Sequence, residues 1–389
     1  MILENKSIRG VNLGSWFLME GYILGGRNIA ESEFKDKFRN VYGDKELRKF
    51  EKNFRDNFIT DIDFKNIAAM GANTVRVPFN HKLFEIKSNV FSENGFKYLE
   101  KVFLLAQRYN LGVILDLHAA PGSQNCDWHG DSRGKALLWE DKLCQKHTFE
   151  LWERIAERFK DEPSLIGYDV LNEPVLGKKN TDVLKGFYKK LIKHIRRVDK
   201  KHIIYLEGDI WAQRIEFLKD LIDDKIAISI HYYQPLNYTF NLSPFYRFPG
   251  KIDNTSWDKK RIYKSLEGYH EFSIKNKVDI FVGEFGLNWR GGFWGELSWL
   301  ESVLQVFDEF GFSYTYWTYK AVANNLFPDG LYQYVPNSEY INRQGPTFGW
   351  EIYLSLWKKN NKAISEFWKT SNFRPNKEII GMLSKFFRL

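Results

Sequence analysis

Residues 165–174 read LIGYDVLNEP, a run that is mostly apolar and ends in Asn172, Glu173 and Pro174. This pattern is typical of a strand that is covered on both faces in a parallel sheet, because neither face meets solvent. Polar side chains that follow such a strand lie at the carboxyl-terminal edge of the sheet. The number of similar runs in the rest of the chain therefore decides the fold.

Seven further apolar runs follow the same pattern, and amphipathic segments lie between them. One of these segments, LKGFYKKLIKHIRRV at residues 184–198, has apolar residues at helical spacing with basic residues between them. Eight strands that alternate with helices are the number in a closed (β/α)8 barrel. We therefore predict an α/β fold, a (β/α)8 TIM barrel that forms a single domain over residues 1–389. The predicted strands are GVNLG (10–14), NTVRVPF (73–79), GVILDLH (112–118), LIGYDVLNEP (165–174), HIIYLEG (202–208), IAISIHYY (226–233), DIFVGEFG (279–286) and FSYTYWTY (312–319).

Four of the segments that follow these strands are unusually long. In a barrel, all of them rise from the C-terminal face, where such folds place their chemistry. We therefore predict enlarged loops that form a walled cleft on that face. The stretches are MEGYILGGRNIAES (19–32), AAPGSQNCDWHGDSRGK (119–135), QPLNYTFNLSPFYRFPG (234–250) and the segment 321–350 after the eighth strand.

Composition limits the class of protein. The chain has 389 residues with 43% apolar content, which excludes low-complexity disorder and collagen-like repeats. No run approaches the roughly 20 apolar residues of a membrane helix, so we expect no membrane span. The start, MILENKSIRG, shows no signal peptide, which predicts a cytoplasmic protein, or a secreted one if a signal was removed. Cys126 and Cys144 could form one disulfide, although reduced thiols are favoured.

The net charge of +8 and the pI near 9.1 raise the possibility of nucleic-acid binding. The basic residues at 184–198 are explained as the solvated face of an amphipathic helix, so we predict no nucleic-acid partner. A nucleic-acid-binding protein would instead have a contiguous basic stripe and steeply salt-dependent binding. The 13 tryptophans suit a core, nucleobase stacking or the flat platforms on which sugar rings lie.

Polar residues gather where the predicted strands end. Any one of them is explained as a satisfied structural group, but six of the eight strands contribute. Glu173 and Glu284 each close an apolar run, and two such carboxylates across a cleft push their pKa values apart. One acid and one ionised carboxylate are the pair that glycosidic bond cleavage requires. The other explanation is two unrelated salt-bridged glutamates. The strand-end residues are Arg76, Asp116, His118, Asn172, Glu173, His231, Tyr233, Glu284 and Trp317.

The ordered set of these residues resembles glycoside hydrolase family 5, whose members are retaining β-glycosidases on (β/α)8 barrels. The matching elements are the Arg of NTVRVPF, the His of DLH, the Asn-Glu of LNEP, the His-x-Tyr of HYY, the Glu of VGEFG and the Trp of YTYW. Within the family, RGVNLGSW with Glu20 and HAAPGSQN with Asn125 are most similar to the exo-β-1,3-glucanase branch.

The resemblance implies a role for each matching residue. It makes Glu284 the nucleophile and Glu173 the acid/base residue, with Arg76 and Tyr233 keeping Glu284 ionised and aimed. Asn172 would bind the sugar 2-hydroxyl, and Trp317 would form the floor of the subsite next to the scissile bond. His118 and His231 would hold sugar hydroxyls or the catalytic residues, and Glu20 and Asn125 would bind hydroxyls.

The resemblance implies an enzyme that cleaves β-glucosidic bonds in β-linked oligo- or polysaccharides by double displacement. We expect an exo-acting β-glucanase of the β-1,3-glucan type or a β-glucosidase. An endo-β-1,4-glucanase, a β-mannanase and a non-catalytic carbohydrate-binding barrel are the alternatives. The segment CDWHGD (126–131) mixes soft and hard donors, so we predict no metal, and no nucleotide-binding fingerprint indicates a cofactor. The sequence leaves the oligomeric state open.

Overall fold

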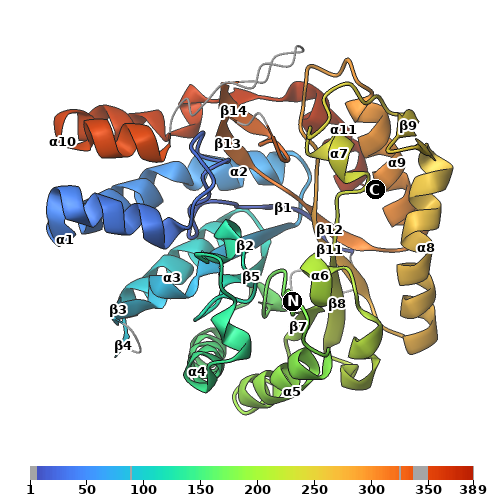
Figure 1. The fold of residues 1–389 in the computed structure, drawn as a ribbon, viewed down its shortest axis with the longest axis horizontal. Helices are drawn as coiled ribbons and strands as arrows, with labels where there is room; N and C mark the ends of the chain where they lie inside the picture. Colours follow the sequence, from blue (N-terminus) through green and yellow to red (C-terminus); the bar gives the residue numbers. More distant parts are fainter. Residues whose placement is uncertain (1–6, 88–89, 324–325, 336–348, 389) are drawn as a thin grey trace.

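The fold is known from a computed structural model, which describes residues 7–87, 90–323, 326–335 and 349–388. Eight parallel strands form a closed barrel in the order β1-β12-β11-β8-β7-β6-β5-β2. Figure 1 shows helices around these strands. The predicted (β/α)8 barrel is confirmed, and each predicted run overlaps one of its strands. They are β1 (Arg9–Asn12), β2 (Thr74–Asn80), β5 (Gly112–Ala119), β6 (Leu165–Asp169), β7 (Ile203–Glu207), β8 (Ile226–Tyr232), β11 (Ile280–Phe285) and β12 (Ser313–Tyr316).

Helices cover the outside of the barrel, and the segment predicted as an amphipathic helix forms α5. The longer helices are α1 (Glu31–Phe58), α2 (Asp61–Ala69), α3 (Glu93–Arg108), α4 (Lys142–Phe159), α5 (Asp182–Arg196), α8 (Lys259–Asn276), α9 (Glu296–Glu309), α10 (Trp350–Phe367) and α11 (Lys377–Phe387). Short helices α6 (Asp209–Ala212) and α7 (Leu236–Thr239) lie in loops. Three small sheets join β3 (Glu85–Lys87) to β4 (Val90–Phe91), β9 (Gly250–Ile252) to β10 (Thr255–Trp257), and β13 (Lys320–Ala323) to β14 (Tyr332–Val335) and β15 (Arg374–Pro375).

The enlarged segments after the strands differ in part from the prediction. Helix α1 begins at Glu31, inside the stretch that we assigned to the first loop. Aromatic rings at helical spacing explain this, because Phe34, Phe38 and Phe50 contact one another and the rings of α10. The two helices consequently lie side by side at one edge of the molecule (Figure 1). In the segment after the eighth strand, residues 324–325 and 336–348 lie outside the described part.

The predicted strand at 165–174 is shorter than expected, because β6 ends at Asp169. Glu173 has a φ of +47°, a left-handed conformation that takes the chain out of the sheet. The backbone here has other partners, since the Asn172 N–H donates to the Leu117 carbonyl at 3.1 Å. Glu173 therefore sits on an irregular segment above the strand end rather than within the strand.

The barrel interior is built in layers that follow from the alternation of side chains along each strand. Ile114, Tyr205, Ala227 and Phe281 form a buried apolar cluster. The next inward residues on β5, β7 and β8 are Asp116, Glu207 and Ser229. The inward residues after these are His118 on β5 and His231 on β8. The apolar cluster is thus followed by a layer of charged side chains, and then by the mouth of the barrel. We call Arg76, Asp116, Asp169 and Glu207 the charged layer.

A bulge in β11 turns Glu284 toward the barrel interior. The register between β11 and β8 shifts between Val282 and Glu284, which makes Glu284 the partner of His231. Bulges of this kind change the direction in which a side chain points. Gly283 permits the close approach, because a Cβ at this position would lie 2.9 Å from the Ser229 Oγ and 3.2 Å from the His231 Nε2.

Two expectations from composition can be compared with the structure. Both cysteines are free, with Cys126 exposed and Cys144 partly exposed. Among the helices of the described residues, none combines the length and apolar character needed to cross a membrane.

We predict that Gly283→Ala lowers the free energy of unfolding by about 1–3 kcal/mol, because the added methyl group overpacks the charged layer. Urea denaturation measures this change. Gly268→Ala is the matched control, since Gly268 lies in α8 with open space around it, and alanine there should raise stability by up to about 1 kcal/mol. Equal stability of Gly283→Ala and the unmodified protein would contradict the packing argument.

Candidate active site

A cavity of about 380 Å³ lies at the mouth of the barrel. Seven of the ten residues predicted from the sequence line it, although they come from distant parts of the chain. Arg76, Asn125 and Asn172 do not line it, because they are fully buried behind its wall. The seven lining residues are Glu20, His118, Glu173, His231, Tyr233, Glu284 and Trp317.

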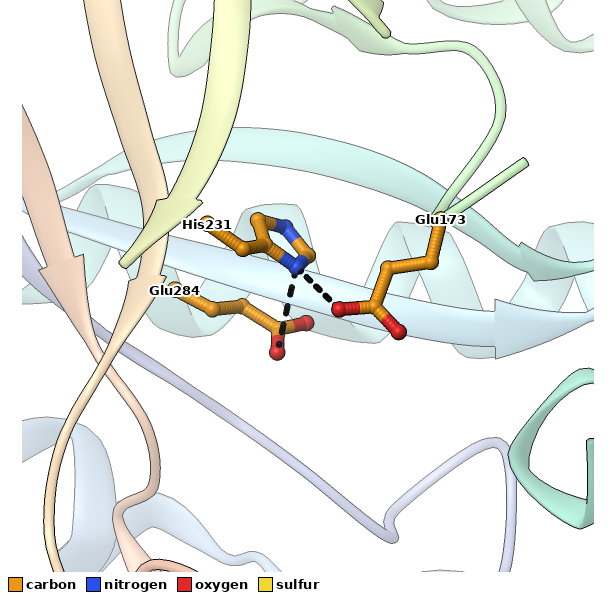
Figure 2. A group of neighbouring side chains, drawn as sticks. All are labelled: Glu173, His231 and Glu284. Atoms are coloured by element: carbon orange, nitrogen blue, oxygen red, sulfur yellow. Dashed lines mark hydrogen bonds and ion pairs between the residues drawn. The ribbon is translucent and has the colours of Figure 1, made fainter. Parts of the chain in front are cut away.

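The two predicted catalytic carboxylates face each other beside His231 (Figure 2). The Nδ1 of His231 lies 2.7 Å from Oε1 of Glu173 and 3.6 Å from Oε2 of Glu284. One ligand atom from each of the three side chains lies within 4.8 Å of the other two. Such a set could also hold a cation, but two carboxylates this close match the roughly 5–5.5 Å separation of retaining glycosidases.

Arg76 binds Glu284 from inside the barrel. Its Nη1 donates to Oε1 of Glu284 at 2.8 Å and to the Asn12 side chain at 3.0 Å. Its Nε donates to Asp169 at 2.9 Å, and its Nη2 lies 3.1 Å from Asp116. One guanidinium therefore serves several buried carboxylates at once.

The charged layer contains more acidic groups than one arginine can neutralise. Burial raises the pKa of Asp116 to about 7, against the opposing effect of Arg76. Burial and the neighbouring Glu207 raise the pKa of Asp169 well above its ordinary value. Protonation of these two groups relieves the excess of negative charge, which leaves Arg76 available to Glu284.

Tyr233 completes the surroundings of Glu284. Its hydroxyl donates to Oε2 of Glu284 at 2.8 Å. Burial and the charge of Glu284 raise the pKa of Tyr233 well above its ordinary value, so the hydroxyl remains a donor. Both oxygens of Glu284 thus accept hydrogen bonds, one from Arg76 and one from Tyr233, which favours the ionised carboxylate.

Glu173 and His231 form a second electrostatic unit. Burial favours a neutral Glu173, but the hydrogen bond and charge of His231 outweigh it and lower the pKa of Glu173 to about 2. Burial also opposes a charge on His231, but Glu207, Glu284 and Glu173 raise the pKa of His231 well above its ordinary value. These directions favour an ion pair in which Nδ1 of His231 donates to the Glu173 carboxylate.

His118 has the opposite character. Its Nδ1 lies 2.7 Å from Asp116, and its ring stacks on Trp317 with centroids 5.4 Å apart. Burial lowers the pKa of His118 to about 3. The ring is therefore neutral and presents Nε2 toward the Asn172 amide at 3.3 Å.

The two asparagines hold backbone and side chains in place. The Asn172 Oδ1 accepts from Arg76 at 2.9 Å. The Asn125 Nδ2 donates to the Glu173 carbonyl at 3.0 Å, and its Oδ1 accepts from the Asp127 N–H at 3.0 Å. Asn125 was expected to bind a sugar hydroxyl, but its position behind the wall and its occupied amide fit the anchoring of Glu173 instead.

Glu20 lies at the β1 side of the cavity and is buried. Burial, followed by the nearby Glu284 and Glu173, raises the pKa of Glu20 well above its ordinary value. Its Oε2 has no hydrogen-bond partner among the described residues. A buried polar atom without a partner is costly, so it suits contact with a polar ligand in the cavity.

Several residues in or next to the cavity wall were missed by sequence reasoning. Trp128 follows β5 and lines the cavity, whereas Trp289, Trp294 and Trp299, which follow β11, do not. Glu207 was missed, although it ends the predicted strand HIIYLEG just as Glu173 and Glu284 follow theirs. Loop aromatics have no such signal. The missed aromatic residues that line the cavity are Tyr22, Trp211, Tyr232, Phe240, Tyr269 and Phe327.

We predict that the His118 ring does not titrate above about pH 5, because its buried position disfavours the imidazolium. Nuclear magnetic resonance of histidine-labelled protein, with His118→Gln for assignment, measures this. Exposed histidine in the urea-unfolded protein is the reference and should titrate near pH 6.5. Titration of His118 near that value in the folded protein would contradict the assignment.

Comparison with known proteins identifies the family. The family model described as cellulase (glycosyl hydrolase family 5) matches residues 36–322. The chain is 28% identical to a beta-xylosidase of Phanerodontia chrysosporium over 81% of this chain and 67% of that protein. It is 27% identical to endoglucanase C of Acetivibrio thermocellus, over 72% of this chain and 89% of that protein. A probable glucan 1,3-beta-glucosidase A of Emericella nidulans is 28% identical over 59% of this chain and 58% of that protein.

Solved structures agree on the fold. The endoglucanase Cel5A of Thermotoga maritima has a TM-score of 0.59 and 22% identity, over 84% of this chain and 92% of that chain. The rutinosidase of Aspergillus niger has a TM-score of 0.64 and 16% identity, over 85% of this chain and 94% of that chain. Because the family model spans most of a barrel whose mouth holds two facing carboxylates, this chain belongs to glycosyl hydrolase family 5 and is a retaining β-glycoside hydrolase.

Proposed function

We propose that Glu284 is the nucleophile and Glu173 the acid/base residue of this hydrolase. Glu284 attacks the anomeric carbon and forms a glycosyl ester, while Glu173 gives its proton to the departing glycosidic oxygen. Water then attacks the anomeric carbon, Glu173 takes its proton, and the ester bond breaks to release Glu284. The bonds of Glu284 to Arg76 and Tyr233 support this assignment, because they favour the ionised form that a nucleophile needs.

The pair of Glu173 and His231 supplies the proton. Glu173 alone would be ionised in the free enzyme, but the short contact to Nδ1 lets the two side chains share one proton. A sugar that enters the site displaces water and brings the glycosidic oxygen to Glu173 as a new acceptor. The shared proton can then pass to the leaving oxygen.

Other residues at the mouth bind the sugar. We assign Trp317 to the floor of the subsite, where the neutral His118 ring stacks on it. Glu20 and His118 line the cavity and are assigned to hydroxyls. Asn172 is assigned to the 2-hydroxyl, because its amide contacts both Arg76 and the cavity residue His118.

An aromatic barrier closes one side of the cavity and carries the proposal of exo action. We use this name for Tyr22, Trp128, Phe240 and Phe327, which come from loops after β1, β5, β8 and β13. Tyr22 contacts Trp128 at 5.4 Å and Phe327 at 5.2 Å between ring centroids. Phe327 contacts Phe240 at 5.1 Å, and Phe240 contacts Tyr233 at 5.1 Å.

The four rings come from loops that follow strands on both sides of β1 in the strand order of the barrel, and they contact one another in a row. A glucan chain bound with one sugar between Trp317 and Glu284 would have to pass through these rings to extend further. The sugar bound there is therefore a chain end. We accordingly propose an exo-acting β-glucanase of the β-1,3-glucan type or a β-glucosidase.

We propose that the leaving group binds on the side of Trp211. This residue follows β7, lines the cavity together with Leu236 and Tyr269, and is 40% exposed. Three consecutive left-handed residues, Ile210 to Ala212, present the Trp211 ring, whose Nε1 donates to Asp127 at 2.9 Å. An exposed ring of this kind suits the apolar face of a second sugar or of another leaving group. This side adjoins Glu173, as an acid that protonates the leaving oxygen requires.

The named relatives include both modes of action, so an endo-β-1,4-glucanase or β-mannanase is the second candidate. The relatives called endoglucanase favour it, whereas the relatives called glucan 1,3-beta-glucosidase favour the first. The aromatic barrier supports the exo mode, because an endo-acting site must be open on both sides of the scissile bond.

We predict that Glu173→Ala lowers kcat/KM by about 100-fold or more on glucans, but far less on aryl β-glycosides with good leaving groups, which need little protonation. Release of the aryl group measures the first step. The glycosyl-enzyme should accumulate in this variant, and added azide should give a β-glycosyl azide.

Glu284→Ala is the matched variant for the nucleophile. It should lose turnover on every substrate, and azide should give a glycosyl azide of inverted configuration. Equal losses for good and poor leaving groups in Glu173→Ala, or normal turnover in Glu284→Ala, would contradict the two assignments.

We predict that the wild-type enzyme releases single sugars or one short product from the non-reducing end of a β-glucan. The double variant Trp128→Ala, Phe327→Ala removes two rings of the barrier, so it should open the cavity and permit internal cleavage. The ratio of viscosity loss to reducing ends measures the difference, on β-1,3-, β-1,4- and β-1,6-glucans and mannan. Trp294→Ala, outside the cavity, is the control. A rapid viscosity loss with the wild-type enzyme would favour the endo mode.

A further inference from the structure

Glu207 is a buried carboxylate at the end of β7 to which the proposed mechanism gives no role. It is fully buried and does not line the cavity, so it does not contact the substrate directly. A carboxylate in such a place is costly unless other groups compensate its charge. The groups that do so are parts of the catalytic site.

Each oxygen of Glu207 has its own set of contacts. Oε2 accepts the backbone N–H of Glu173 at 2.6 Å. Oε1 lies 3.2 Å from Nε2 of His231, as an ion pair rather than a well-aligned hydrogen bond. Oε1 also lies 3.4 Å from Nη2 of Arg76 and 3.5 Å from the Ser229 hydroxyl.

The contact with the Glu173 backbone bears on the position of the acid. Glu173 holds a left-handed backbone conformation, which is uncommon for a residue with a side chain. The hydrogen bond from its N–H to a charged carboxylate is of the strong kind, and it stabilises this conformation. The Asn125 amide holds the carbonyl of the same residue at 3.0 Å. Both polar groups of the Glu173 backbone are thus fixed.

The contact between Glu207 and His231 affects which ring nitrogens of His231 bear protons. Glu207 faces one ring nitrogen and Glu173 the other, so the imidazole lies between two carboxylates. A carboxylate next to Nε2 favours a proton on that nitrogen, as in other sites where the partner of one ring nitrogen sets the tautomer. The second proton of the ring then lies on the Nδ1 side, against Glu173.

Other titratable groups surround this unit. His129 places Nε2 3.5 Å from Oε2 of Glu173, and although burial opposes its charge, Asp127 and Glu173 raise the pKa of His129. Glu284 faces His231 from β11 at 3.6 Å, and Asp116 on β5 acts on it through the charged layer. Asp169 on β6 adjoins Glu207 through Arg76. From α5, the Tyr188 hydroxyl donates to the Glu207 carbonyl at 2.8 Å. Of these groups, only Glu207 contacts both His231 and the Glu173 backbone.

We propose that Glu207 is a positioning residue for the acid/base step, which holds the Glu173 backbone and keeps Nε2 of His231 protonated. The proposal rests on the acid/base role of Glu173. In the first step the proton shared by Nδ1 and Glu173 passes to the glycosidic oxygen, which keeps the electron pair of the broken C–O bond. In the second step the pair regains a proton from the attacking water. The Nε2 proton stays in place throughout.

Glu207→Gln tests the proposal, because glutamine keeps an oxygen for the Glu173 N–H but removes the charge beside His231. Loss of this charge lets the Glu173–His231 pair release its proton more easily. The basic limb of the pH profile of kcat/KM, which reports the free enzyme, should therefore move to lower pH by about one unit or more. At the optimum, kcat/KM should fall about tenfold or more for poor leaving groups and less for good ones.

Asp169→Asn is the matched control, since it alters the other carboxyl group on Arg76 without contacting His231 or Glu173. It should leave the basic limb where it is in the wild-type enzyme. An unmoved basic limb in Glu207→Gln would overturn the proposal, because a merely structural role changes the rate without moving the profile. The leaving-group effects in Glu173→Ala test the acid/base role of Glu173 separately. Failure of that role can therefore be distinguished from failure of the positioning role of Glu207.

A measurement on the wild-type enzyme covers the case in which Glu207→Gln does not fold. Nitrogen-15 spectra of histidine-labelled enzyme report which ring nitrogens of His231 bear protons. We expect Nε2 to stay protonated across the whole pH range of activity, while the Nδ1 signal follows the basic limb. An unprotonated Nε2 of His231 within the active range would overturn the proposal.

Discussion

The contact between Arg76 and Glu284 is the interaction on which the site depends. The guanidinium is fully buried, so its charge must be compensated by neighbours inside the barrel. Glu207 and Glu284 do so, whereas Asp116 and Asp169, whose pKa values are raised, contact the guanidinium as further hydrogen-bonding partners. The barrel thus holds a cation at a fixed depth, and that cation orients one carboxylate at the cavity surface.

The alternation of side chains along the strands places these groups. On β5 and β8, an inward apolar residue near the bottom of the barrel is followed two residues later by a polar side chain and then by a histidine that lines the cavity. The bulge at Gly283 departs from this alternation and brings Glu284 opposite His231. Loops supply the rest of the lining, including the four rings of the aromatic barrier and Trp211.

Much of the fold and of the site could be predicted from the sequence. The eight apolar runs identified the strands, and the polar residues at their ends identified the groups that line the cavity, because strand ends of a parallel barrel converge. Glu207 was missed although it obeys the same rule, since no family motif drew attention to it. The left-handed conformation of Glu173, the bulge in β11 and the helix within the first predicted loop depend on tertiary contacts that a local pattern does not contain. The aromatic barrier could not be predicted, because its rings come from four irregular loops whose meeting is a property of the folded chain.

The nucleophile is the centre of the account, and covalent trapping tests it most directly. A 2-deoxy-2-fluoro-β-glycoside with a good leaving group slows the second step, so the glycosyl-enzyme should accumulate and inactivate the enzyme. Peptide mapping by mass spectrometry then locates the sugar. We predict one attached sugar per chain, on the peptide that contains Glu284. A sugar attached to another residue, or inactivation without a covalent adduct, would contradict the account.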